Sequence, residues 1–213
     1  MWVLFIAAAI AFSFRDFAGN SMGSLGSLFL QQAHGFSVRE TGFALSWIFL
    51  ASLVSNPLFG HLSDRGRMRW TCLVLVIAAG VVAVFPRVPA GGVAPVFMLY
   101  GFFFVASYPM VEAALMEAVP DAVRGRVFGL WITIGGLAGN ISHWLVGHWV
   151  EGFGERANHP ETYFPLYAAL GLIILLSLAG LPWLRAIRRR EHLDPAPAAA
   201  LDAHPSARPP RSE

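Results

Sequence analysis

Residues 60–70 read GHLSDRGRMRW and place one Asp and three Arg between two long apolar runs. A helix needs about 20 mostly apolar residues to cross a lipid bilayer, and each run comes close to that length. Charged side chains are costly inside a bilayer, so this cluster marks a point where the chain returns to water. The stretch therefore predicts two membrane-spanning helices joined by a short charged turn.

The composition of the whole chain agrees with this interpretation. Of its 213 residues, 56% are hydrophobic and only 13% are charged, whereas about 25% are charged in soluble domains. We therefore expect a polytopic membrane protein. The net charge is only +2 and the fifteen basic residues form no basic stripe, which argues against a nucleic-acid partner. We find no spacing typical of metal ligands, and we expect neither a metal nor a cofactor.

Six segments are long and apolar enough to span a membrane, or nearly so. We expect an all-α fold with helices at about residues 2–31, 38–62, 70–86, 93–119, 125–150 and 162–185. Residues 1–190 would form one transmembrane domain. Residues 191–213 are rich in Pro and Ala and lack periodicity, so we expect a disordered cytoplasmic tail.

The distribution of Arg predicts the orientation, because basic loops stay in the cytoplasm. The loops after the second, fourth and sixth segments and the start of the tail contain Arg65, Arg67, Arg69, Arg124, Arg126, Arg185, Arg188, Arg189 and Arg190. The opposite loops contain only Arg39, Arg87 and Arg156. Both termini are therefore expected in the cytoplasm, as an even number of helices requires. We expect an integral protein of a bacterial plasma (inner) membrane.

The charged turn resembles a motif of the major facilitator superfamily. In that family the loop between the second and third helices reads approximately G-x-x-x-D-R-x-G-R-R. Gly60, Asp64 and Arg65 match this pattern in register, whereas Gly66 and Arg67 come one residue early. The resemblance implies that Asp64 and Arg65 belong to a conformational latch that holds helices together in one access state.

A second stretch, EAVPDAVRGRVFGLW, resembles the family pattern that follows the fourth helix. Pro120, Arg124, Gly125 and Gly129 carry this resemblance, and it adds Arg124 and Gly125 to the expected gating motif with Gly60. The resemblance covers about residues 1–190. It implies a secondary transporter that works by alternating access.

Three features are typical of the C-terminal half of such transporters. The fourth helix begins without an Arg, the fifth has Asn140 where a Pro is expected, and the chain ends in a tail rich in Arg and Pro. Met1 also enters the first apolar segment at once. We therefore expect a half-size unit, which would be a truncated chain, one subunit of a split pair or one copy in a homodimer.

Arg15 and Asp16 lie near the middle of the first segment, where a charge is a candidate for function. Consecutive residues point about 100° apart on a helix, so we expect this pair not to bind each other well. At least one of the two should face a cavity or another helix. Two roles are open: substrate or proton coupling, and a structural pair between helices.

Glu112 follows Pro109 in the fourth segment, where a kink is expected. It shares a four-residue row with Tyr100, Phe104, Tyr108 and Met116. Glu112 and Tyr108 are therefore candidates for substrate or proton coupling. The alternative is an acid that pairs with Arg124, Arg126 or Arg15.

Small residues recur four apart in the first and fifth segments, where they let helix backbones approach closely. These rows contain Gly19 and Gly23, then Gly135, Gly139, His143 and Gly147. His143 is the last coupling candidate, and its alternative role is that of a packing residue with a hydrogen bond.

The sequence thus predicts a secondary transporter that moves a small solute, with H+ as a candidate coupling ion. Its partners would be the lipid bilayer and a second six-helix unit. The alternative is a membrane subunit that assembles with another membrane protein without transporting. An enzyme is not expected, because the metal-ligand pattern H-E-x-x-H does not occur.

Overall fold

The computed structural model describes residues 2–64 and 66–193, and this part of the chain is helical without strands. Its α-helices are α1 (Trp2–Ala33), α2 (Val38–Ser63), α3 (Arg67–Val84), α4 (Val93–Phe104), α5 (Ser107–Glu117), α6 (Arg124–Glu151), α7 (Phe164–Ser177) and α8 (Gly180–Leu193). Short 3₁₀ turns lie at Phe85–Arg87, Ala90–Gly92, Asp121–Val123, Gly154–Asn158 and Pro160–Tyr163. The predicted all-α class is confirmed. Most of the expected tail, residues 194–213, lies outside the described residues.

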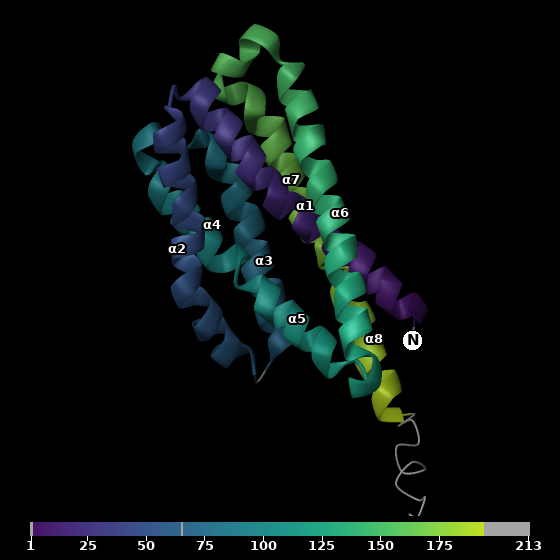
Figure 1. Cartoon of the computed structure of the whole chain (residues 1–213). Coiled ribbons are helices and arrows are strands. Elements are labelled where there is room, and N and C mark those ends of the chain that lie inside the picture. The colour runs from purple at the N-terminus through teal and green to yellow at the C-terminus, as the bar shows by residue number, and fades with distance from the viewer. Residues whose placement is uncertain (1, 65, 194–213) are drawn as a thin grey trace, which may run out of the picture.

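The helices make six antiparallel passes along one bundle (Figure 1). Helices α4 and α5 together form one pass, and α7 and α8 form another. Five passes are long and apolar enough to cross a membrane: Trp2–Ala33, Val38–Ser63, Arg67–Arg87, Ala90–Glu117 and Pro160–Ile187. The sixth, α6, is 28 residues long and carries more polar side chains. The fold is that of a polytopic membrane protein.

Two passes are broken four residues before a proline. Pro109 of α5 lacks the N–H that would bond to the carbonyl of Val105, and α4 ends at Phe104. The Tyr108 N–H bonds to that carbonyl instead, at 3.1 Å, in a tighter turn. Leu181 N–H and the Leu178 carbonyl repeat this arrangement before Pro182 of α8, also at 3.1 Å. The kink expected near Pro109 is thus a full break between two helices.

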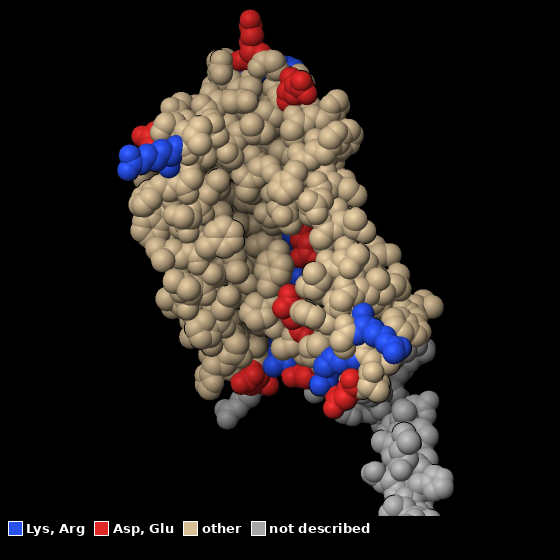
Figure 2. Space-filling view, viewed as in Figure 1, with Lys and Arg blue, Asp and Glu red and all other residues tan. Residues whose placement is uncertain are grey.

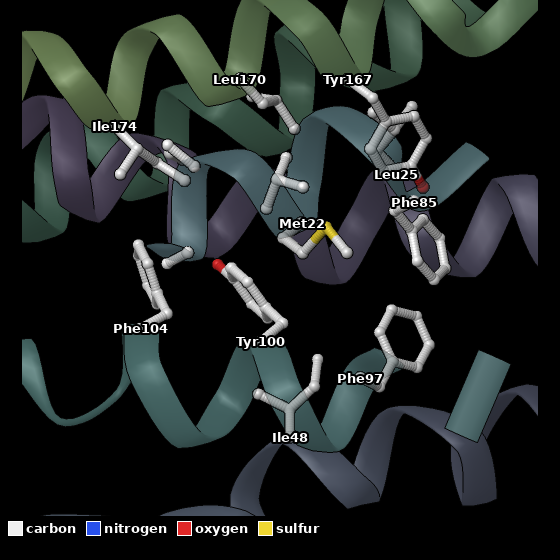
Figure 3. Packing of buried hydrophobic residues seen from close by; sticks show 14 of the residues in the cluster. Met22, Leu25, Ile48, Phe85, Phe97, Tyr100, Phe104, Tyr167, Leu170 and Ile174 are labelled. Atoms are coloured by element: carbon white, nitrogen blue, oxygen red, sulfur yellow. The ribbon is translucent and has the colours of Figure 1, made fainter. Parts of the chain in front are cut away.

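Helix α1 runs through the bundle and packs against α2, α6, α7 and α8. Tyr100 and Phe104 of α4 point toward Met22 of α1 inside the buried cluster shown in Figure 3. The opposite face of α4 meets α2 so closely that a Cβ on Gly101 would overlap the backbone of Ile48. Only glycine allows this close contact between the two helices.

Two glycines of α6 leave room for polar side chains of α1. A Cβ on Gly135 would overlap the carboxylate of Asp16, and a Cβ on Gly139 would come within 3.0 Å of the Asn20 side chain. Helix α6 therefore packs Gly135 and Gly139 against polar side chains of α1.

Other glycines singled out from the sequence have no such role. A Cβ on Gly23, Gly60, Gly125 or Gly147 would meet no atom of the described chain within 4 Å. Gly60 therefore makes no close contact with another helix within these residues.

Candidate functional site

Arg15 and Asp16 form an ion pair near the middle of α1. Arg15 Nε and Nη2 donate hydrogen bonds to Asp16 Oδ1 at 3.1 and 2.9 Å. The expectation that consecutive residues would not pair well is wrong. The angle of about 100° separates the Cβ directions, but the long Arg15 side chain bends back over that angle to reach its neighbour.

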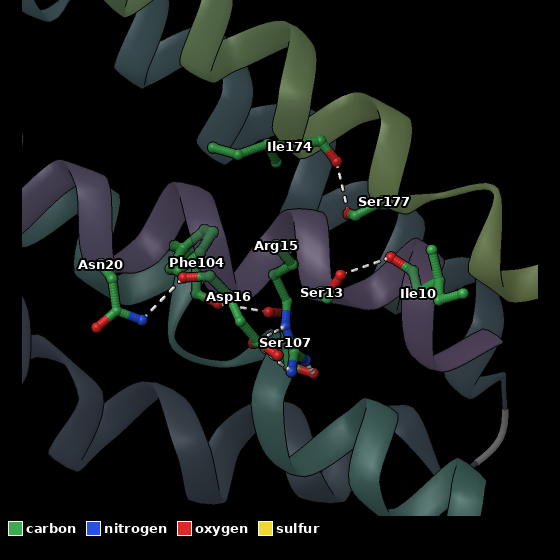
Figure 4. Close-up of polar contacts among 9 residues, drawn as sticks. All are labelled: Ile10, Ser13, Arg15, Asp16, Asn20, Phe104, Ser107, Ile174 and Ser177. Atoms are coloured by element: carbon green, nitrogen blue, oxygen red, sulfur yellow. Dashed lines mark hydrogen bonds and ion pairs between the residues drawn. The ribbon is translucent and has the colours of Figure 1, made fainter. Parts of the chain in front are cut away.

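The Arg15 guanidinium is enclosed by groups of α5 and of its own helix, α1. Its side chain is 1% exposed, and Nη1 donates to the carbonyl of Ser107 at 3.4 Å. The ring of Tyr108 lies 3.9 Å from the guanidinium carbon, and the ring of Phe12 lies 5.7 Å away. Figure 4 shows Arg15 and Asp16 extending from α1 toward Ser107, at the start of α5. The helix break before Pro109 thus lies beside the buried charge.

Glu112 lies one turn beyond Tyr108 on α5 and is half-buried. It is close enough to Arg15 and Asp16 to interact with the charges of both. Among the side chains that the structure describes, no basic group comes within 4.0 Å of its carboxylate. The expected alternative, a direct pair of Glu112 with an Arg, is therefore not seen there. We call Arg15, Asp16, Tyr108 and Glu112 the central site.

The aromatic row expected beside Glu112 is present. Tyr100 and Phe104 are stacked with ring centroids 4.8 Å apart, and Phe104 meets Tyr108 edge-on at 5.8 Å. The Tyr108 hydroxyl lies over Gly19 of α1, where a Cβ would come within 2.9 Å of it. This row fixes the ring that covers Arg15.

His143 lies apart from the central site. Its Nδ1 makes a short hydrogen bond with the hydroxyl of Ser24 on α1. Ser24 is eight residues beyond Asp16, and eight helical residues span about 12 Å. His143 therefore shares the α1–α6 contact with Asp16, but not the same level of the bundle.

The charged turn between α2 and α3 is tied to the end of α5. Arg67 forms an ion pair with Glu117 and lies 3.4 Å from Asp64. Asp64, Arg67 and Glu117, which we call the loop cluster, border a pocket of about 350 Å³ that Arg69 and Arg185 also line. Arg65 lies outside the described residues.

The sequence did not indicate the role of Arg67, because Arg67 comes one residue earlier than the corresponding Arg of the family motif. The three-residue spacing of Asp64 and Arg67 at a helix start was the available signal. Arg124 instead stays within its own loop, where Nη2 lies 2.6 Å from Asp121 Oδ1 and 3.4 Å from the carbonyl of Val119. Asp64 and Arg124 of the expected gating motif thus have separate ion-pair partners.

The sequence profile described as Major Facilitator Superfamily matches residues 2–212. The chain belongs to the major facilitator superfamily. It is therefore an integral membrane protein and a transporter of the major facilitator type, a class that moves small solutes. No solved structure matches this superfamily member significantly.

In this superfamily member, charge is concentrated at two levels of the bundle. The central site lies inside the spanning segments, and the loop cluster lies at the end where α2, α5 and α8 terminate. Helix α5 connects the two levels, since it carries Tyr108 and Glu112 near its start and middle and Glu117 at its end. A movement of α5 would affect both levels.

Proposed function

We propose that the chain forms one six-helix unit of a secondary transporter that works by alternating access. A second six-helix unit, in the same polypeptide, in a separate subunit or in a second copy, would complete the pathway. In such transporters the solute site lies near the bilayer midplane between the two units. The central site is our candidate for this unit's contribution, with His143 as a more distant polar contact.

One observation carries the proposal: the enclosed Arg15–Asp16 pair with Glu112 nearby. A charged residue at the bilayer centre costs about 2.5–3.5 kcal/mol on insertion scales. Packing alone does not require three such residues, because apolar side chains of similar size would fill the same space. Their presence beside a helix break supports a role in binding or coupling, with Asp16 and Glu112 as candidates for carrying H+.

The loop cluster supports a second part of the proposal, a latch. The pair of Arg67 with Glu117 ties the α2–α3 turn to α5, and Asp64 adds a second carboxylate beside Arg67. Breaking these contacts would free the end of α5. We place this end, with both termini, on the cytoplasmic side of a bacterial plasma membrane, in accord with its many Arg residues. Gly60, Arg65, Arg124 and Gly125 remain proposed members of this gating region.

The proposal is tested with the complete transporter in liposomes that enclose a pH-sensitive dye. Adding solutes one at a time should produce proton or solute flux with at least one of them. Asp16→Asn and Glu112→Gln should each reduce that flux at least 10-fold. Glu151→Gln is the matched control, because it removes a carboxylate at the end of α6.

The alternative, a subunit that assembles without transporting, predicts a different result. Both central variants would then assemble normally with the second unit, and any activity of the complex would be unchanged. Normal assembly together with lost flux supports transport, and unchanged flux in both variants contradicts it.

A further inference from the structure

The charges of the central site do not cancel. Arg15 supplies one positive charge, whereas Asp16 and Glu112 supply two carboxylates. These are the charged residues that lie well inside the described spanning segments; the other described charges lie in loops or near the ends of the spans, with Arg185 and Arg189 in α8. When both acids are ionised, the interior of this unit carries a net negative charge.

The positive charge is shielded and the negative charges are accessible. Every nitrogen of the Arg15 guanidinium already donates a hydrogen bond, Nε and Nη2 to Asp16 and Nη1 to Ser107. The ring of Tyr108 covers the group. The Asp16 side chain, in contrast, is 14% exposed and Glu112 is half-buried. The carboxylates are therefore more accessible to an incoming ion than the one cation is.

The side chain of Asn20 adds a hydrogen-bond acceptor beside Asp16. Asn20 is exposed one turn from Asp16, and its Nδ2 donates to the Asp16 backbone carbonyl at 2.8 Å. Its Oδ1 accepts no hydrogen bond from the described residues. Figure 2 shows red acidic atoms along a hollow on the face that α2 and α6 border, where blue basic atoms appear only in small patches.

We propose that the central site binds an organic cation, with the carboxylate of Glu112 as its counter-ion and with Asp16 and Asn20 as further acceptors. Charge attraction is stronger in a low-dielectric interior than in water, and a carboxylate without a basic partner there gains most from a cation. This inference rests on the proposed function, because it assigns a solute class to the same site.

Binding is tested with two ions of the same shape and opposite charge, tetraphenylphosphonium and tetraphenylborate. Equilibrium dialysis of the full chain in neutral detergent should show saturable binding of tetraphenylphosphonium only. Glu112→Gln should weaken that binding at least 10-fold, and Glu112→Asp, which keeps the charge, should retain most of it. Glu151→Gln should bind as the unmodified chain does.

Three results would overturn the inference: no saturable phosphonium binding, equal binding of the borate, or unchanged binding in Glu112→Gln. A monodisperse size-exclusion profile for Glu112→Gln, or retained binding in Glu112→Asp, separates lost charge from misfolding. Binding in detergent requires no transport. Cation binding without flux would therefore contradict the proposed function alone, and flux restricted to neutral or anionic solutes would contradict this inference alone.

Discussion

Arg15 and Asp16 illustrate how strongly a buried charge depends on its partner. Arg15→Met would leave the Asp16 carboxylate without its cation, and breaking a buried ion pair costs about 3–5 kcal/mol. We expect a clearly lower thermal unfolding temperature in detergent. The double variant Arg15→Met/Asp16→Leu should recover most of that loss, because it removes both charges, while transport stays absent. Equal stability of all three proteins would contradict an energetic coupling of the pair.

The surroundings of His34 disfavour the charged, protonated form of its side chain. It follows the end of α1, its Nε2 is buried without a hydrogen-bond partner in the described chain, and its ring meets Phe29 edge-on at 4.9 Å. Burial lowers the pKa of His34 below its ordinary value of 6.5. The unfolded chain therefore binds a proton at a higher pH than the folded protein does.

We accordingly expect the free energy of unfolding to be highest above pH 6.5 and to fall as the pH drops below that value. The decrease ends once His34 is protonated in the folded state as well. Thermal unfolding at several values between pH 7.5 and 5 measures this slope. His34→Phe should make the slope shallower, whereas the exposed His159→Phe should leave it as it was. An identical slope in the His34 variant would exclude this residue as its source.

At the scale of helices, the sequence predicts the structure best where the length of an apolar run determines where a helix lies. Each expected helix corresponds to one observed pass, because the bilayer thickness fixes how long an apolar run must be. The fourth and sixth are each split into two helices, however, and α8 continues to Leu193, eight residues past the expected end at residue 185. Arg15, Asp16 and Glu112 could be found from the sequence for the same reason, since charges stand out in apolar segments. Their mutual contacts could not, because these depend on how far a side chain bends and on a carbonyl from α5.

The break between α4 and α5 is the element that sequence reasoning described least well. Pro109 explains why a hydrogen bond is lost, and the buried Arg15 beside Ser107 explains why the break is tolerated at this level. Proline costs about 3 kcal/mol in a helix interior. Pro109→Ala should therefore raise the unfolding temperature, and it should slow transport by straightening the pass that carries Glu112.

Pro182→Ala is the matched control, because Pro182 follows an equivalent break between α7 and α8. It should also stabilise the protein, with a smaller effect on the transport rate. Unfolding temperature and initial transport rate, measured on both variants, separate the two effects. Equal slowing in both would mean that helix breaks serve flexibility in general, with no special role for the break beside Arg15.

At the scale of the whole molecule, the loop cluster is expected to control access to the central site from one end. Arg67→Ala removes the contact between the α2–α3 turn and α5, so the Arg-rich end of the bundle should open more often.

The measurement uses Asn20→Cys in a Cys72→Ala background, because Asn20 is exposed beside the central site. A membrane-impermeant maleimide applied from the Arg-rich end should label this cysteine several-fold faster when Arg67 is replaced. Arg69→Ala is the control, because Arg69 lies in the same turn and forms no ion pair among the described residues. If Arg67→Ala lowers membrane insertion as much as transport and leaves labelling unchanged, the turn acts on topology and the latch is excluded.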